Sequence, residues 1–208
     1  MENYIKTTID TYNKTAKEYV EKVKELVPMN ELEKFINYVP SGNVLDIGCG
    51  SGVGAKNLQE RGLQVYGIDL SEELLKAAKK ESPRSYFYKM DMRDLDILGN
   101  SIFDGIWQMA SLLHLEKKDV PIALSEANRV LKPKGIIYVP VKMGEGEGLE
   151  PDERYGGELK YYAYYQQKEI ESFLKKADFE ILENYWIKYN DTYRNAHPWM
   201  NVFARKKA

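Results

Sequence analysis

The chain has 208 residues, of which 43% are hydrophobic, and this is enough for the core of one domain. Its formal net charge of −2 disfavours polymeric nucleic acid as a partner, because nucleic-acid-binding surfaces are usually basic. No run of about 18 apolar residues is present, so no membrane span is expected, and with Cys49 as the only cysteine neither a disulfide nor a cysteine-rich metal site is expected. The N-terminus lacks the apolar core of a signal peptide, so we expect a cytoplasmic protein. We also expect a monomer or a homodimer.

The first two-thirds of the chain alternates between helical and strand patterns. Residues 2–38 carry apolar side chains at helical spacing and predict two helices, the second beginning near Asn30. Short apolar runs then predict strands at 43–47, 64–68, 85–88, 103–109 and 136–141. Helices are predicted between them at 52–61, after an N-cap at Ser71, and at 117–131. Strands that alternate with helices indicate a parallel sheet.

The regular alternation of predicted strands and helices ends after residue 141. A glycine- and glutamate-rich loop is predicted at Met143–Pro151, an extended aromatic segment at Tyr161–Tyr165, and a helix at Gln167–Ala177. Phe179–Tyr189 and Trp199–Arg205 read as strands that pair antiparallel. We therefore expect one doubly wound α/β domain over residues 1–208. Its seven-stranded sheet is mostly parallel, with an antiparallel C-terminal strand and helices on both faces.

Polar side chains gather where the predicted strands end. The run V-L-D-I-G-C-G-S-G-V-G at residues 44–54 places Asp46 before a glycine-dense turn that lets backbone approach a ligand closely. Asp69, Asp91 and Gln108 stand at or just past the next strand ends. One such aspartate is often only a helix N-cap. Three of them beside a glycine turn favour one polar ligand lying across the sheet edge.

Asp69 follows the glycine turn by about twenty residues, the spacing at which an acid meets the two hydroxyls of a ribose. Each carboxylate oxygen can accept one hydroxyl, and a phosphate on that ribose would be repelled. The spacing therefore predicts a ligand that contains an adenosine with free ribose hydroxyls.

These segments resemble the class I S-adenosylmethionine-dependent methyltransferases, over roughly residues 10–205. The motifs that carry the resemblance are Val44–Gly52, Gly67–Ser71, Asp91-Met92, Phe103–Trp107 with Ser111–His114, and Leu131–Gly135. The resemblance implies S-adenosyl-L-methionine as cofactor, S-adenosyl-L-homocysteine as product, and a small-molecule methyl acceptor. No cluster of residues at metal-ligand spacing is found.

The resemblance also implies roles at the methionine end of the cofactor. Gly48 and Gly50 would let backbone approach the methionine moiety. Asp46 would act on its ammonium group through water, and the backbone around Gln108 would line the same end.

At the nucleoside end, the resemblance implies that Asp69 takes the ribose hydroxyls and that Leu70 packs on the adenine. Asp91 would accept from the adenine amino group, and the Met92 amide would bind a ring nitrogen.

The segment 12–19 resembles the N-terminal lid helix of the family, in which Tyr12 and Tyr19 would close over the cofactor; plain helix packing is the alternative for both. On this interpretation residues 1–40 form a lid, residues 41–141 the cofactor-binding half, and residues 142–208 the acceptor side.

Several residues leave alternatives open. His114 follows the fourth strand and is either a general base or a structural, substrate-shaping residue. Cys49 and His197 are interpreted as structural. The acidic segment Gly144–Gly148, followed by Glu150, Asp152, Glu153 and Arg154, is either a solvated loop or a lid over the acceptor whose acids attract a cationic amine. The cluster Tyr161, Tyr162, Tyr164 and Tyr165 alternates between the two faces of a strand, so some rings point to the core and others line a pocket. Arg194 and Trp199 are left unassigned.

Two other functions compete with methyl transfer. Gly50–Ala55 fits G-x-G-x-x-A, so an NAD-dependent oxidoreductase is one alternative, although Asp46 would then lie near a pyrophosphate. A catalytically silent module that binds S-adenosylmethionine is the other.

Overall fold

Seven strands form the main sheet of the computed structural model, which describes residues 2–24, 26–189 and 197–208. The strands are β1 (Asn43–Ile47), β2 (Gln64–Asp69), β3 (Tyr86–Lys89), β4 (Phe103–Trp107), β5 (Leu131–Lys142), β8 (Phe179–Ile187) and β9 (Trp199–Lys206). Their order is β3-β2-β1-β4-β5-β9-β8. β9 runs antiparallel to both of its neighbours, and the other pairs are parallel. This confirms the predicted fold class.

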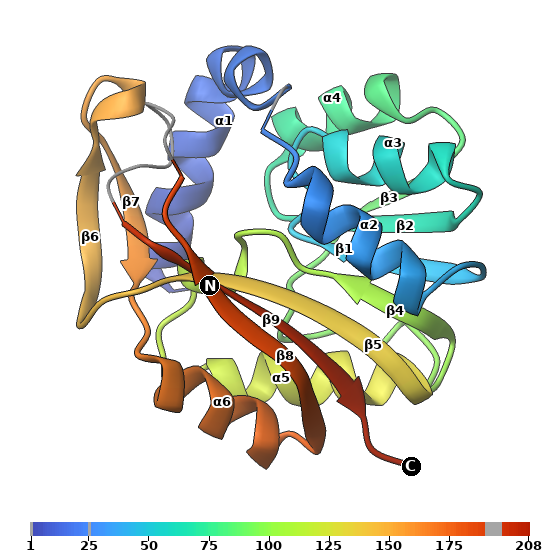
Figure 1. Ribbon diagram of the computed structural model, residues 1–208. Helices are drawn as coiled ribbons and strands as arrows, with labels where there is room; N and C mark the ends of the chain where they lie inside the picture. Colours follow the sequence, from blue (N-terminus) through green and yellow to red (C-terminus); the bar gives the residue numbers. More distant parts are fainter. Residues whose placement is uncertain (1, 25, 190–196) are drawn as a thin grey trace.

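Helices cover both faces of the sheet (Figure 1). On one face pack α2 (Met29–Tyr38), α3 (Val53–Glu60) and α4 (Glu72–Glu81), and on the other α5 (Val120–Val130) and α6 (Gln167–Lys176). Each helix buries one apolar stripe, as α2 does with Leu32 and Phe35. Gly105 in β4 makes room for this helix, because a Cβ there would lie 2.7 Å from the ring of Phe35.

The glycine turn after β1 adopts backbone conformations that other residues rarely tolerate. Gly48, Gly50 and Gly52 have φ angles of 70°, 52° and 81°. A Cβ on Gly48 would lie 2.3 Å from the Cβ of Ser111, and one on Gly52 would lie 2.8 Å from the Cα of Ala78. The turn therefore packs directly against the loop after β4 and against α4, at the point where strand order reverses between β1 and β4.

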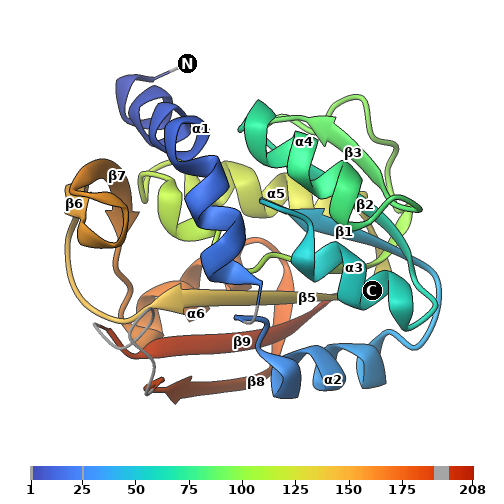
Figure 2. The same cartoon turned by 90° about the horizontal axis from the view of Figure 1, so that it is seen from above.

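The segment after β5 differs from the prediction. Residues 147–152 form β6 (Glu147–Asp152), which pairs antiparallel with β7 (Glu158–Ala163). The short helix η2 (Glu153–Tyr155) lies in the connection between the two strands. The loop prediction was wrong for residues 147–151, because β7 supplies hydrogen-bond partners that the local composition does not reveal. Figure 2 shows this hairpin beside α1 and beyond the carboxyl end of β5.

Helix α1 (Asn3–Val23) bridges the β6–β7 hairpin and α4. The hydroxyl of Thr11 donates to the carbonyl of Leu159 at 2.6 Å. On the other side, the hydroxyl of Ser71 donates to Oδ1 of Asn13 at 2.8 Å. Ser71 is the predicted N-cap of α4, and its oxygen also accepts from the amide of Leu74. In the described ranges, none of the helices combines the length and hydropathy needed to cross a membrane.

Candidate functional site

A cavity of about 240 Å³ lies at the carboxyl ends of the parallel strands, between the glycine turn and α1. Every predicted site residue except Gln108 lines it: Tyr12, Tyr19, Asp46, Gly48, Gly50, Asp69, Leu70, Asp91, Met92 and His114. Residues about 100 positions apart in the chain thus meet in one cavity, as expected for the crevice outside the strand ends of an open α/β sheet.

Asp46 is buried near the end of β1, with 2% of its surface exposed. Its Oδ2 has no hydrogen-bond partner in the part of the chain that the structure describes. Burial raises the pKa of Asp46 to about 8, and the negative charge of Asp69 adds to this effect. An unpartnered buried carboxyl oxygen is costly in the free protein, so this atom is a strong candidate to receive a ligand donor.

Asp69 ends β2 and shapes the glycine turn. Its Oδ2 accepts from the Gly50 amide at 2.9 Å, and its Oδ1 accepts from the Ser71 amide at 2.8 Å. Burial raises its pKa, and these two amides oppose that shift. Each oxygen keeps a second lone pair that can accept a ligand hydroxyl.

Asp91 is already engaged in an ion-pair network that the sequence did not reveal. It accepts from the Arg93 guanidinium, with NH2 to Oδ2 at 2.8 Å, and Arg93 also binds Glu2 and Asp119. Leu70 and Met92 are partly buried apolar neighbours on the same side of the cavity.

Gln108 is buried and does not line the cavity. Its Nε2 donates to the sulfur of Met92 at 3.4 Å, and its amide donates to the carbonyl of Tyr138. Its neighbours Trp107, Met109 and Ala110 line the cavity in its place. The backbone around Gln108 was expected to line the ligand site. The structure places these neighbours at the cavity, and not Gln108 itself.

His114 lies in the 3₁₀ helix η1 (Leu112–His114) and pairs with Tyr12 of α1. Its Nδ1 lies 2.7 Å from the carbonyl of Tyr161, which can only accept, so Nδ1 carries the proton. Nε2 then accepts from the Tyr12 hydroxyl at 2.9 Å. Burial lowers the pKa of His114 to about 3, and the charge of Lys160 lowers it further, so the ring is neutral.

Tyr12 and Tyr19 both line the cavity and pack edge to face, with ring centroids 5.4 Å apart. The Tyr19 hydroxyl lies 3.1 Å from the position that a Cβ on Gly50 would occupy. α1 therefore sits directly over the glycine turn, where the lid interpretation places it.

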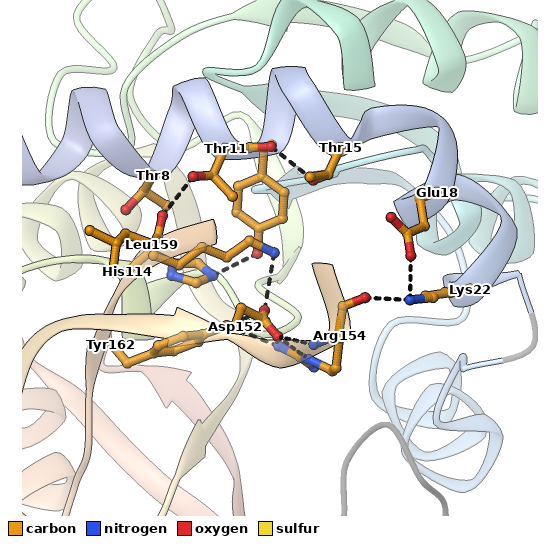
Figure 3. A network of polar contacts seen from close by, with 12 residues as sticks. Thr8, Thr11, Thr15, Glu18, Lys22, His114, Asp152, Arg154, Leu159 and Tyr162 are labelled. Atoms are coloured by element: carbon orange, nitrogen blue, oxygen red, sulfur yellow. Dashed lines mark hydrogen bonds and ion pairs between the residues drawn. The ribbon is translucent and has the colours of Figure 1, made fainter. Parts of the chain in front are cut away.

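A cationic cluster at the far end of the cavity was not identified from the sequence. Arg154 holds Asp152 through two contacts of 2.7 Å, and the fully buried ammonium of Lys160 lies 3.2 Å from the same carboxylate. Figure 3 shows Asp152, Arg154 and His114 gathered beneath α1. Lys142 adds a further cation to the cavity wall. It is the last residue of β5, so the strand-end argument extended to that strand would have found it.

The remaining predicted residues have other surroundings. Cys49 is buried and burial raises its pKa, which agrees with a structural role. The ring of His197 lies 4.7 Å from that of Tyr164. Arg194 lies outside the described residues. Within those residues, no group of three or more His, Cys, Asp or Glu is placed to hold a metal ion.

Comparison with known proteins points to one family. The family model described as Methyltransferase domain matches residues 45–139. A malonyl-(acyl-carrier protein) O-methyltransferase of Buchnera aphidicola subsp. Baizongia pistaciae is 31% identical over 137 residues, which cover 64% of this chain and 53% of that protein. The chain thus spans about half the length of this curated relative.

Solved structures share the fold at low identity. A methyltransferase from Methanosarcina mazei superposes with a TM-score of 0.74 at 23% identity, covering 82% of this chain and 95% of that one. The Burkholderia thailandensis 1,6-didemethyltoxoflavin-N1-methyltransferase, solved with its substrate and S-adenosylhomocysteine, gives 0.78 at 19% identity, covering 99% and 89%. At these identities the likeness concerns the fold alone.

The strand order, with a glycine turn and a cavity at the strand ends, is that of an α/β domain with the fold of these methyltransferases. With the family match over residues 45–139, the chain is similar to the class I S-adenosylmethionine-dependent methyltransferases. The resemblance inferred from the sequence is confirmed.

Proposed function

We propose that the chain transfers a methyl group from S-adenosylmethionine to a small-molecule acceptor. The observation that carries this proposal is the row of carboxyl groups at the ends of β1, β2 and β3 in one cavity beside the glycine turn. Such a row suits an amino-acid nucleoside, which presents an ammonium group and ribose hydroxyls. It suits a pyrophosphate poorly, because carboxyl groups beside the turn would repel the phosphates whenever they ionise.

The residues of the cavity fit the methionine end of this cofactor. Asp46 offers an oxygen without a partner among the described residues, suited to an ammonium group directly or through water. Side chains at Gly48 and Gly50 would collide with Ser111 and crowd Tyr19, so backbone is what faces a ligand there.

At the nucleoside end we assign Asp69 to the ribose hydroxyls, and Leu70 with Met92 to the adenine. Asp69 is held by two backbone amides, which fixes its carboxylate before a ligand arrives. The assignment of Asp91 to the adenine amino group requires it to accept one more donor beside Arg93.

When bound, the sulfonium supplies an activated methyl group, so the residues of the chain have to orient the acceptor and exclude water. Orientation alone can contribute on the order of 7–11 kcal/mol. We assign the covering role to α1, where Tyr12 and Tyr19 lie over the cavity. Residues 1–40 would act as a lid, residues 41–141 would hold the cofactor, and residues 142–208 would face the acceptor.

His114 is the candidate base for an acceptor that must lose a proton. A pKa of about 3 makes its ring a weak base, and its Nε2 is occupied by the Tyr12 hydroxyl. These contacts favour the orienting role over the role of a base, with Tyr12 held in place by His114.

The proposal is tested by methyl transfer from isotopically labelled S-adenosylmethionine to a metabolite extract, with products identified by mass spectrometry. We expect one labelled small molecule that depends on active protein. Binding of S-adenosylhomocysteine without any labelled product would support the silent module. A change in NADH fluorescence on binding, with no response to S-adenosylhomocysteine, would support the oxidoreductase. A cytoplasmic location, and a monomer or homodimer, stay predictions.

A further inference from the structure

The charges that line the cavity are separated between its two ends. The carboxyl groups of Asp46, Asp69 and Asp91 lie where β1, β2 and β3 end, whereas Lys142 and Arg154 lie on the side of β5 and the β6–β7 hairpin. If the acidic end receives the cofactor, the cationic end is left for the other reactant.

Lys142 is partly buried, and no carboxylate of the described residues forms an ion pair with it. Its ammonium lies 3.8 Å from the ring centroid of Tyr162 and 5.9 Å from that of Tyr164. Burial lowers its pKa to about 8, which leaves it charged at neutral pH. A charged group in this setting gains considerably from an anion that enters the cavity.

The acids nearest to Lys142 are committed elsewhere. Asp152 binds Arg154 through two contacts and also lies beside Lys160. Glu150 accepts from the hydroxyl of Tyr164 at 2.6 Å. Among the described residues, three cations therefore face two carboxylates here, and the neutral ring of His114 adds no charge.

A second, independent observation concerns Trp199, the partner of Lys142 across the β5–β9 pair. Trp199 is 6% exposed and lines the same cavity. Its Nε1 has no hydrogen-bond acceptor within the described ranges. A buried donor without an acceptor beside a cation without an anion forms a site that suits anionic oxygen.

We propose that the methyl acceptor carries an anionic oxygen group, a carboxylate or a phosphate, that binds at Lys142 and Arg154 with the indole N–H of Trp199 as a further donor. This inference rests on the proposed function, because it assigns the opposite end of the cavity to the cofactor. It makes Lys142 a specificity-determining residue. This proposal disfavours the alternative in which the acids of Gly144–Gly148 attract a cationic amine. Both acids already accept hydrogen bonds, Glu145 from the side chain of Gln166 and Glu147 from the amide of Lys117.

The test uses protein saturated with S-adenosylhomocysteine and four small probes: methyl phosphate, propionate, neutral propionamide and cationic propylamine. Calorimetry measures each probe against the wild type, Lys142→Gln, Lys142→Arg, and Lys79→Gln, which removes an exposed lysine of α4. The affinity for S-adenosylhomocysteine is measured first in every variant. We expect it to be the same in all of them.

We expect the two anions to bind more tightly than propionamide and propylamine. Lys142→Gln should weaken anion binding by roughly tenfold or more, since it removes one partner of a desolvated charge pair. Lys142→Arg and Lys79→Gln should keep it. The tighter of the two anions identifies the acceptor group as phosphate or carboxylate.

Equal affinity for propionate and propionamide, tighter binding of propylamine, or wild-type anion binding by folded Lys142→Gln would overturn the inference. Failure of the wild type to bind S-adenosylhomocysteine would instead reject the proposed function. The two failures are therefore distinguishable.

Discussion

Binding of S-adenosylhomocysteine should release a proton from Asp46. Burial gives this carboxyl a pKa of about 8 in the free protein. The Henderson–Hasselbalch relation then makes Asp46 roughly nine-tenths protonated at pH 7. An ammonium group beside Oδ2 favours the ionised form, so its pKa falls on binding. Linkage predicts that about 0.9 proton leaves at pH 7, and that affinity rises with pH until about pH 8.

Calorimetry in buffers of different ionisation enthalpy measures this proton directly. For the wild type at pH 7, the observed binding enthalpy plotted against buffer enthalpy should have a slope that corresponds to release of about one proton. Asp46→Asn should abolish the slope, and Asp96→Asn, which changes an exposed aspartate, should leave it intact. A wild-type slope of zero, or the same slope in Asp46→Asn, would refute the reasoning.

Four further predictions concern three other residues of the site. Asp69→Ala should weaken S-adenosylhomocysteine binding by roughly tenfold or more in calorimetry, because two ribose hydroxyls lose their acceptor; unchanged affinity in a folded variant would sink the ribose assignment. Gly48→Ala should lower stability to urea by about 1–3 kcal/mol, because a left-handed φ and the Cβ of Ser111 oppose it; an unchanged midpoint would contradict this. The pKa of His114, about 3, lies below its ordinary value of 6.5, so the unfolded chain binds the extra proton between these values. The wild type should therefore lose stability relative to His114→Gln as the pH falls from 6.5 toward 3, and a constant difference would contradict the burial argument. If His114 is the general base, His114→Gln should lose most of its turnover and keep its affinity for the cofactor. Retained turnover in this variant would reject the role of a base.

The main sheet was predictable because its information is local. Each parallel strand is a short apolar run, and the strand-end acids follow those runs directly. β6 was not predictable in the same way, because its six residues include three acids, a glycine and a proline, and its partner β7 follows only after a turn. A strand of this kind is specified by pairing rather than by its own composition.

The candidate site likewise combines residues that local sequence predicts with contacts that it does not. The spacing of Asp46 and Asp69 placed them correctly in one cavity. Arg93 links Asp91 to Glu2 and Asp119, which lie 91 and 26 positions from it in the chain. The pairing of Tyr12 with His114 joins residues 102 positions apart. No local pattern carries such contacts.

The most direct test of the central claim is a crystal structure of the protein with S-adenosylhomocysteine. It should place the ribose hydroxyls on the carboxylate of Asp69, the adenine between Leu70 and Met92, and the ammonium group beside Asp46. A nucleoside bound outside this cavity, or inside it with the ribose away from Asp69, would contradict the account.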